Sequence, residues 1–227
     1  MDSDSVKSKW FEDFKQLQQM IKSKADIDRI KKLLLSLHSQ IHDSSVYDTS
    51  KTYYDEIVCN LCEENFRICP TKTNMTIAWD LWHITRIEDL TTSIFLCNDK
   101  QVFERYDAKD FGVKVTDTIN AMTDEEVMDF SSKLSIKAML DYRAEVGKKT
   151  KSFIEGLTQG ELKRKFNDEQ KQRVINEGGV IPETAWLADF WGRKNVGGVF
   201  LMPTTRHQMM HLNDCMRIVT WYYKRSK

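Results

Sequence analysis

Apolar residues recur at helical spacing along almost the entire chain. Residues three and four apart lie on one face of an α-helix, and in a globular protein an apolar face of this kind is buried. No segment alternates convincingly with a period of two, which is the pattern of a half-buried β-strand. The apolar stripes predict helices over about residues 10–21, 27–41, 53–69, 76–97, 123–130, 132–159 and 203–222.

Polar residues and prolines mark several of the expected helix ends. Asp26 is placed to cap the second helix, and Ser131 or Ser132 can cap the long helix that follows the middle of the chain. Pro70 ends the third helix, whereas Pro203 stands where the first turn of the last helix tolerates a proline.

Two regions between the helices are less regular. Residues 98–131 are mixed and rich in loops, with one short helix expected. Residues 161–202 hold two glycine-bearing segments, INEGGVIPE and WGRKNVGGVF, which suit a turn or a short hairpin beside a site. Four long amphipathic helices with extra elements in their connections predict an all-α four-helix bundle in one domain.

The composition of the chain excludes several classes of function. Its 227 residues include 34 Lys and Arg and 34 Asp and Glu, so no excess of charge favours a nucleic acid or a membrane surface as a partner. The first residues are too charged for a secretory signal peptide, and no apolar run approaches membrane-spanning length. We therefore expect a cytoplasmic protein that binds neither nucleic acid nor membrane.

The five cysteines do not point to a disulfide framework, because their number is odd and no signal peptide precedes them. Cys59 and Cys62 form a CxxC pair, but the surrounding segment reads as an amphipathic helix and no second CxxC completes a zinc ribbon. We expect these cysteines to be small buried hydrophobic residues.

Three histidines carry the most informative pattern in the chain. His83 lies in TIAWDLWHITRIEDL, and His207 and His211 lie in PTTRHQMMHLND, four residues apart and therefore on one helix face. Three neutral imidazoles that converge can bind a divalent transition metal and leave a position open for substrate or water. Asp214 shares the face of the histidine pair, where it can orient an imidazole or handle protons.

A second pair, His38 and His42, also has four-residue spacing, and spacing alone does not choose between the two pairs. The charged residues that follow His83 are expected to form ion pairs on the helix surface or between helices, and one of them could orient a substrate. These residues are Arg86, Glu88 and Asp89. No GxGxxG, P-loop, GxSxG or HExxH motif is present, so a nucleotide-dependent enzyme or a serine hydrolase has no support.

The segment IAWDLWHITRIEDL, followed later by WLADFWGRKNVGGVFLMPTTRHQMMHLND, resembles the DinB-like superfamily of four-helix-bundle metalloproteins. The resemblance spans about Leu33 to Tyr222. It implies an up-down-down-up bundle over residues 26–227, with residues 1–25 as an N-terminal helical extension and a loop-rich insertion before the last helix. It also implies a divalent metal ion (nickel, zinc, iron or manganese across the family).

The ligands that the resemblance implies for this metal are His83, His207 and His211. Relatives in the family include thiol-dependent enzymes, namely bacillithiol S-transferases and a mycothiol-dependent maleylpyruvate isomerase. The expected function is therefore that of a metal-dependent S-transferase or hydrolase, using a low-molecular-weight thiol or water on a small electrophile held near Trp82 and Trp191. Analogy also suggests a homodimer. The alternative is a non-catalytic bundle that binds a metal or a ligand.

Overall fold

The computed structural model describes residues 3–70 and 75–225, and all of the regular structure in these ranges is helical. The α-helices are α1 (Ser3–Ser23), α2 (Ile27–Ser39), α3 (Ser44–Tyr47), α4 (Tyr53–Val58), α5 (Ile77–Leu90), α6 (Ala108–Phe111), α7 (Asp124–Lys133), α8 (Ile136–Gly156), α9 (Asp168–Asn176), α10 (Trp186–Gly192), α11 (Val196–Leu201) and α12 (Arg206–Arg225). The 3₁₀ turns are η1 (Glu63–Arg67), η3 (Val102–Arg105), η4 (Glu161–Lys163) and η5 (Pro182–Thr184), and η2 (Thr91–Leu96) continues α5 as a π-helix.

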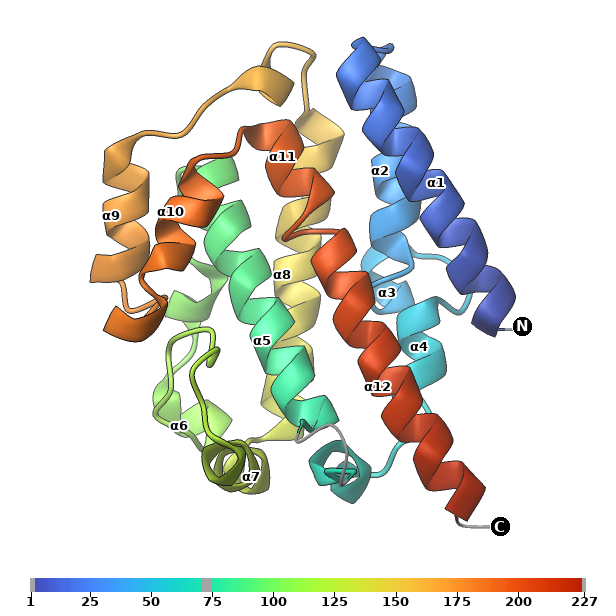
Figure 1. Cartoon of the computed structure of the whole chain (residues 1–227), viewed down its shortest axis with the longest axis vertical. Coiled ribbons are helices and arrows are strands. Elements are labelled where there is room, and N and C mark those ends of the chain that lie inside the picture. The colour runs from blue at the N-terminus through green and yellow to red at the C-terminus, as the bar shows by residue number, and fades with distance from the viewer. Residues whose placement is uncertain (1–2, 71–74, 226–227) are drawn as a thin grey trace.

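Helices α2, α5, α8 and α12 form a four-helix bundle in which α5 packs against both α8 and α12, and α2 packs against α8. Helices α5 and α8 run in one direction, while α2 and α12 run in the other (Figure 1). In chain order the four helices are therefore up, down, down, up. The all-α bundle predicted from the sequence is confirmed.

The caps explain where two of these helices begin. The Asp26 carboxylate accepts hydrogen bonds from the backbone N–H groups of Asp28 and Arg29, which confirms the predicted cap of α2. The Thr76 hydroxyl accepts a hydrogen bond from the N–H of Trp79, so α5 begins at the next residue after this threonine. Both caps satisfy N–H groups that have no partner within the helix.

The prediction that Ser131 or Ser132 caps α8 is wrong. Both serines lie inside α7, which begins at a capping box formed by Thr123 and Glu126 and continues to Lys133, beyond its expected end. Helix α8 begins only after Ser135, whose hydroxyl accepts a hydrogen bond from the N–H of Ala138.

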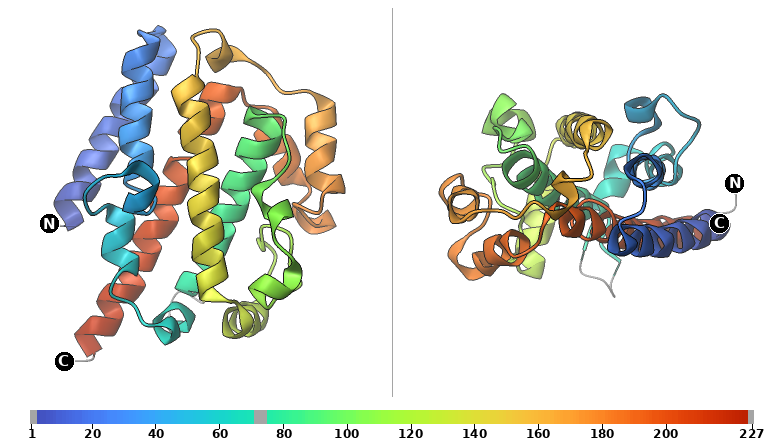
Figure 2. Two further views of the ribbon diagram at one scale, coloured as in Figure 1. Left: turned by 180° about the vertical axis from the view of Figure 1, so that it is seen from behind. Right: turned by 90° about the horizontal axis from the view of Figure 1, so that it is seen from above.

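The turn predicted at INEGGVIPE is confirmed, because α9 ends in a turn in which Gly178 adopts a positive φ of 71°. The hairpin is not formed, because residues 161–202 fold into the short helices α9, α10 and α11. Asn167 and Asn195 cap α9 and α11, and one isolated bridge between Lys165 and Asn195 is the β-pairing found in the described ranges. Position 197 in α11 favours glycine, because a Cβ there would come within 3.2 Å of the Ile21 side chain and of the Leu162 carbonyl oxygen. Figure 2 shows α9 and α10 on the side of the bundle opposite α1.

Helix α1 spans 21 residues and is longer than the short helix expected from its apolar stripe. Trp10, Phe14 and Leu17 are buried in the same hydrophobic core as the bundle, and α1 lies along α2 (Figure 1). The indole N–H of Trp10 donates a hydrogen bond to the carbonyl oxygen of Leu37 at 2.9 Å. Residues 1–2 of the expected extension and residues 226–227 of the expected bundle lie outside the described ranges.

Replacing Trp10 by Phe is expected to lower the free energy of unfolding by about 1–3 kcal/mol, because the buried carbonyl of Leu37 loses its hydrogen-bond donor. Trp186→Phe is the matched control, since this side chain is 59% exposed and its replacement should change stability by less than about 0.5 kcal/mol. Urea unfolding followed by circular dichroism measures both. Equal effects of the two substitutions would show that α1 does not stabilise the bundle through this contact.

The CxxC segment differs from the single helix expected over residues 53–69. Helix α4 ends at Val58, and the Asn65 side chain accepts a hydrogen bond from the N–H of Cys62, which begins the separate turn η1. Cys59 and Cys62 are exposed, so the prediction that they are buried is wrong, while Cys215 is buried. All five thiols are free.

Within residues 3–70 and 75–225, no helix combines the length and the apolar character needed to cross a membrane.

Candidate metal centre

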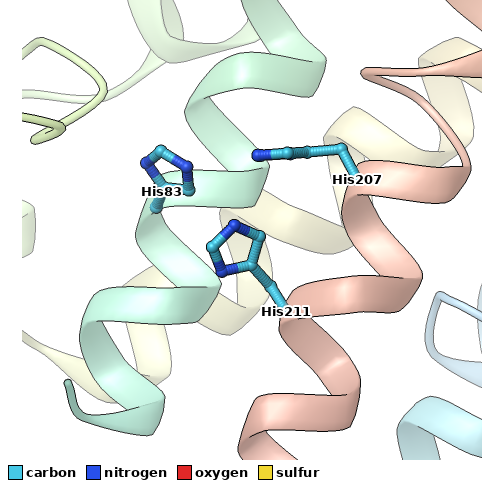
Figure 3. A group of neighbouring side chains, drawn as sticks. All are labelled: His83, His207 and His211. Atoms are coloured by element: carbon cyan, nitrogen blue, oxygen red, sulfur yellow. The ribbon is translucent and has the colours of Figure 1, made fainter. Parts of the chain in front are cut away.

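The structure brings together the three histidines that the sequence singled out. His83 lies on α5, and His207 and His211 lie on successive turns at the start of α12, which packs against α5. One ring nitrogen from each residue lies within 4.8 Å of the other two. Figure 3 shows the side chains of His207 and His211 reaching from α12 toward His83.

Hydrogen bonds on the outer side of two rings fix which nitrogen carries the hydrogen. The Nδ1–H of His83 donates to the carbonyl oxygen of Thr118 at 2.7 Å, because a carbonyl can only accept. The Nδ1–H of His211 donates to the Asp80 carboxylate, also at 2.7 Å. With the hydrogen on Nδ1, Nε2 is the nitrogen of His83 and of His211 that is available to bind a metal.

Burial keeps two of the rings neutral. Desolvation, reinforced by the neighbouring imidazole of His211, lowers the pKa of His83 to about 3. Burial and the two other histidines hold the pKa of His207 well below its usual value. A neutral imidazole is the form that binds a metal, because a protonated ring has no free lone pair.

Two buried polar atoms beside this group have no hydrogen-bond partner among the described residues, namely Nδ1 of His207 and Nε1 of Trp79. Such atoms are uncommon in folded proteins and often mark a position where a ligand or ion binds. The indole of Trp79 stacks on His83 with ring centroids 4.7 Å apart and an interplanar angle of 10°. It also lies 6.1 Å from the ring of His211, so it forms an aromatic wall of the centre.

The prediction that Trp82 and Trp191 line the pocket is corrected by their surroundings. Trp82 is fully buried, packs edge-on against Phe111 and Phe130, and donates its indole N–H to the Asp117 carbonyl. Trp191 belongs to a separate hydrophobic cluster that joins α9 and α10 to the end of α5. An adjacent residue on a helix lies about 100° round the axis, so Trp82 and His83 lie on different faces of α5.

The carboxylate that orients His211 is Asp80, not the predicted Asp214. Asp80 is 2% exposed, whereas the Asp214 side chain is 43% exposed and pairs with Arg217 on its own helix. Burial raises the pKa of Asp80, and the hydrogen bond from His211 opposes that rise. The sequence held a signal for this residue and for Trp79, because positions three and four before His83 share its helix face.

The charged residues after His83 are not on the helix surface. Arg86, Glu88 and Asp89 are all fully buried. Arg86 and Asp89 belong to one hydrogen-bonded network with Tyr142, and Glu88 contacts His38 and His42. None of the three therefore faces the group formed by His83, His207 and His211.

The donor set of this group fits a divalent transition metal. Imidazole nitrogen suits zinc, iron, nickel and copper, and three protein ligands leave at least one coordination position open. Within the described residues the group contains three ligand residues and no fourth. The chain therefore has side chains able to bind a metal ion at this position.

An all-α bundle with histidines projecting from two facing helices belongs to a class of folds that build metal sites between their helices. The sequence model of the DinB superfamily matches residues 47–215, which is most of the chain and includes all three histidines of the centre. The chain belongs to the DinB superfamily, as the resemblance indicated. No curated protein matches the chain significantly.

Proposed function

We propose that this member of the DinB superfamily is a metal-dependent enzyme whose metal ligands are His83, His207 and His211. The observation that carries the proposal is the convergence of three ring nitrogens within 4.8 Å, two of them with Nδ1 bonded on the outer side of the ring. This arrangement orients Nε2 of His83 and His211 before any ion binds, so little conformational freedom is lost on binding.

The incomplete ligand set favours catalysis over a purely structural role. Structural zinc sites are usually closed by four protein ligands, whereas catalytic sites keep a position free. The residues that could have closed the shell lie elsewhere, because Asp214 pairs with Arg217 and His38 contacts Glu88. His207 and His211 are partly exposed, whereas a purely structural site is usually enclosed by its ligands.

The residues of the chain supply the rest of the centre. His83 and His211 are held by Thr118 and Asp80, and the indole of Trp79 covers one side. A divalent ion held there would supply a Lewis acid that makes a thiolate or hydroxide available near neutral pH. We infer that the reaction is S-transfer or hydrolysis of a small electrophile, with a low-molecular-weight thiol or water as the nucleophile.

The test uses tag-free protein loaded with zinc, manganese, iron(II) or nickel in separate samples. Each sample is mixed with a chromogenic chloro-aromatic electrophile and a panel of low-molecular-weight thiols that includes bacillithiol and mycothiol. We expect metal-dependent consumption of electrophile that His211→Ala abolishes and Met210→Ala, on the same helix and exposed, preserves. Stoichiometric metal binding without turnover under every condition would contradict catalysis and support the alternative, a non-catalytic binding bundle.

The contact between Asp80 and His211 gives a separate prediction about affinity. Asp80→Asn should weaken metal binding by about 10–100-fold, the usual effect of removing a carboxylate that orients a ligand histidine. Asp214→Asn is the matched control and should leave the affinity unchanged, because Asp214 pairs with Arg217. Competition with a fluorescent zinc chelator measures both. If Asp214→Asn weakened binding as much as Asp80→Asn, the assignment of Asp80 would be wrong.

A further inference from the structure

A second group of metal-ligating side chains lies elsewhere in the bundle. His38, His42 and Glu88 are all fully buried, and one ligand atom from each lies within 4.8 Å of the others. Nε2 of His38 lies 2.7 Å from Oε1 of Glu88, and Nε2 of His42 lies 3.0 Å from Oε2. Two imidazoles thus direct the same ring atom at one carboxylate.

The group comes from a different side of α5 than the three-histidine centre. His38 is in the last turn of α2, His42 follows that helix, and Glu88 is five residues after His83 on α5. Five residues advance about 7.5 Å along a helix and turn about 140° round its axis. The two groups therefore hold separate positions and share no ligand.

The surrounding structure is shaped to hold the two rings. Nδ1 of His38 is hydrogen-bonded to the hydroxyl of Tyr47. Gly147 lies in the middle of α8, where glycine destabilises a helix by about 1 kcal/mol relative to alanine. A Cβ at this glycine would lie 2.5 Å from Nδ1 of His42, so the absence of a side chain makes room for the ring.

Among the described residues, no lysine or arginine forms an ion pair with the carboxylate of Glu88, whose bonded partners are His38 and His42. Arg143, a buried cation of the same core, donates its hydrogen bonds to Thr85, the Ile41 carbonyl and Gln208 instead. Nδ1 of His42 also has no partner among the described residues. A buried carboxylate without a lysine or arginine partner is stabilised when a cation binds to it.

We propose that His38, His42 and Glu88 form a second binding site for a divalent transition metal ion. Two imidazoles and one carboxylate are a ligand set used by iron(II), manganese, cobalt and zinc. Binding through Nε2 places the ring hydrogen on Nδ1, where the Tyr47 hydroxyl accepts it from His38. The proposal is independent of the proposed function, because none of its residues belongs to the three-histidine centre.

Because its ligands are buried, the second site should exchange its metal ion more slowly than the three-histidine centre. All three of its ligands are inaccessible to solvent, whereas His207 and His211 are partly exposed. An ion can reach the second site only when the bundle opens locally or while the chain folds. Loading should therefore require refolding in the presence of metal, and release to a chelator should be much slower than from the three-histidine centre.

The decisive experiment counts cobalt in His207→Ala/His211→Ala, which keeps the second site intact. The protein is refolded with Co²⁺, freed of loosely bound ion by a brief EDTA treatment and analysed for metal. We expect one cobalt per chain with a visible d–d absorption spectrum. We expect none after Glu88→Gln is added, in a variant whose helical content by circular dichroism is unchanged.

Absence of slowly released cobalt from the folded double variant would overturn the proposal and would leave the three-histidine centre untouched. If either variant fails to fold, the wild-type chain decides. Refolded wild type should hold cobalt that leaves in a fast and a slow phase of one equivalent each. A single fast phase would show that the buried group is a hydrogen-bonded cluster only.

Discussion

His207→Ala/His211→Ala should weaken binding of a rapidly exchanging divalent metal ion by more than about 100-fold. Two of the three converging imidazoles are lost, and even the loss of an outer carboxylate partner costs about 10–100-fold in affinity. Chelator competition over minutes measures this site. Helical content should be unchanged, because both side chains lie on the partly exposed face at the start of α12.

The matched control for this pair is Met210→Ala, on the same helix turn and 46% exposed. This substitution should leave metal affinity within about twofold of the wild type. His83→Ala should resemble the double variant, because it removes the ligand contributed by α5. Metal affinity that survived both the double variant and His83→Ala would show that the ion binds elsewhere.

The second large effect concerns stability. Asp89→Ala is expected to lower the free energy of unfolding by about 3–5 kcal/mol, because it leaves the buried guanidinium of Arg86 without its carboxylate. The same carboxylate also accepts hydrogen bonds from the hydroxyl of Tyr142 at 2.7 Å and from the N–H groups of Val102 and Phe103 at 2.9 and 2.8 Å. Asp89→Ala therefore removes hydrogen bonds that join α5 both to α8 and to the segment after η2.

Asp129→Ala provides the comparison, because Asp129 forms an exposed pair with Lys133 one helical turn away. Exposed pairs of this kind contribute about 0–1 kcal/mol. Denaturant unfolding of both variants measures the difference. Similar losses of stability in the two variants would contradict the account of the Arg86–Asp89 network.

The bundle could be predicted because amphipathic periodicity reports helices directly, and a local residue such as Asp26 fixes where one begins. The error at Ser131 arose because several serines in one stretch can serve as a cap, and the sequence pattern does not show that α7 continues through Ser131 to Lys133. Short helices such as α11 were missed because a segment with Gly197 and Gly198 has little helical propensity of its own. Close packing against neighbouring elements decides its conformation.

The histidines of the centre could be predicted because local helical spacing and the family resemblance both identify them. Four-residue spacing places His207 and His211 together, and the family resemblance supplies His83 across the bundle. The carboxylate could not be assigned in this way, because Asp80 reaches His211 from the facing helix and Asp214 competes for the same role in sequence. Pairing across helices depends on their relative rotation, which local patterns do not contain.

The sequence alone could not choose between the two histidine pairs, because the choice also depends on how the helices face one another. The structure shows that the pairs do not compete, because His38 and His42 meet Glu88 while His207 and His211 meet His83. The third residue of each group, His83 or Glu88, lies on α5, and the two lie on different sides of that helix. The spacing of His83 and Glu88 on α5 can be read from the sequence, but the helices that face these two residues cannot.

The most direct test of the central claim is a crystal structure of the metal-loaded protein with anomalous diffraction data collected at the absorption edge of the bound metal. We predict an anomalous peak about 2.0–2.2 Å from one nitrogen each of His83, His207 and His211, with no fourth protein ligand. Asp80 should still accept the hydrogen bond from His211 in that structure. A loaded crystal without a peak among these three residues, or with a fourth protein side chain closing the shell, would contradict a catalytic metal centre.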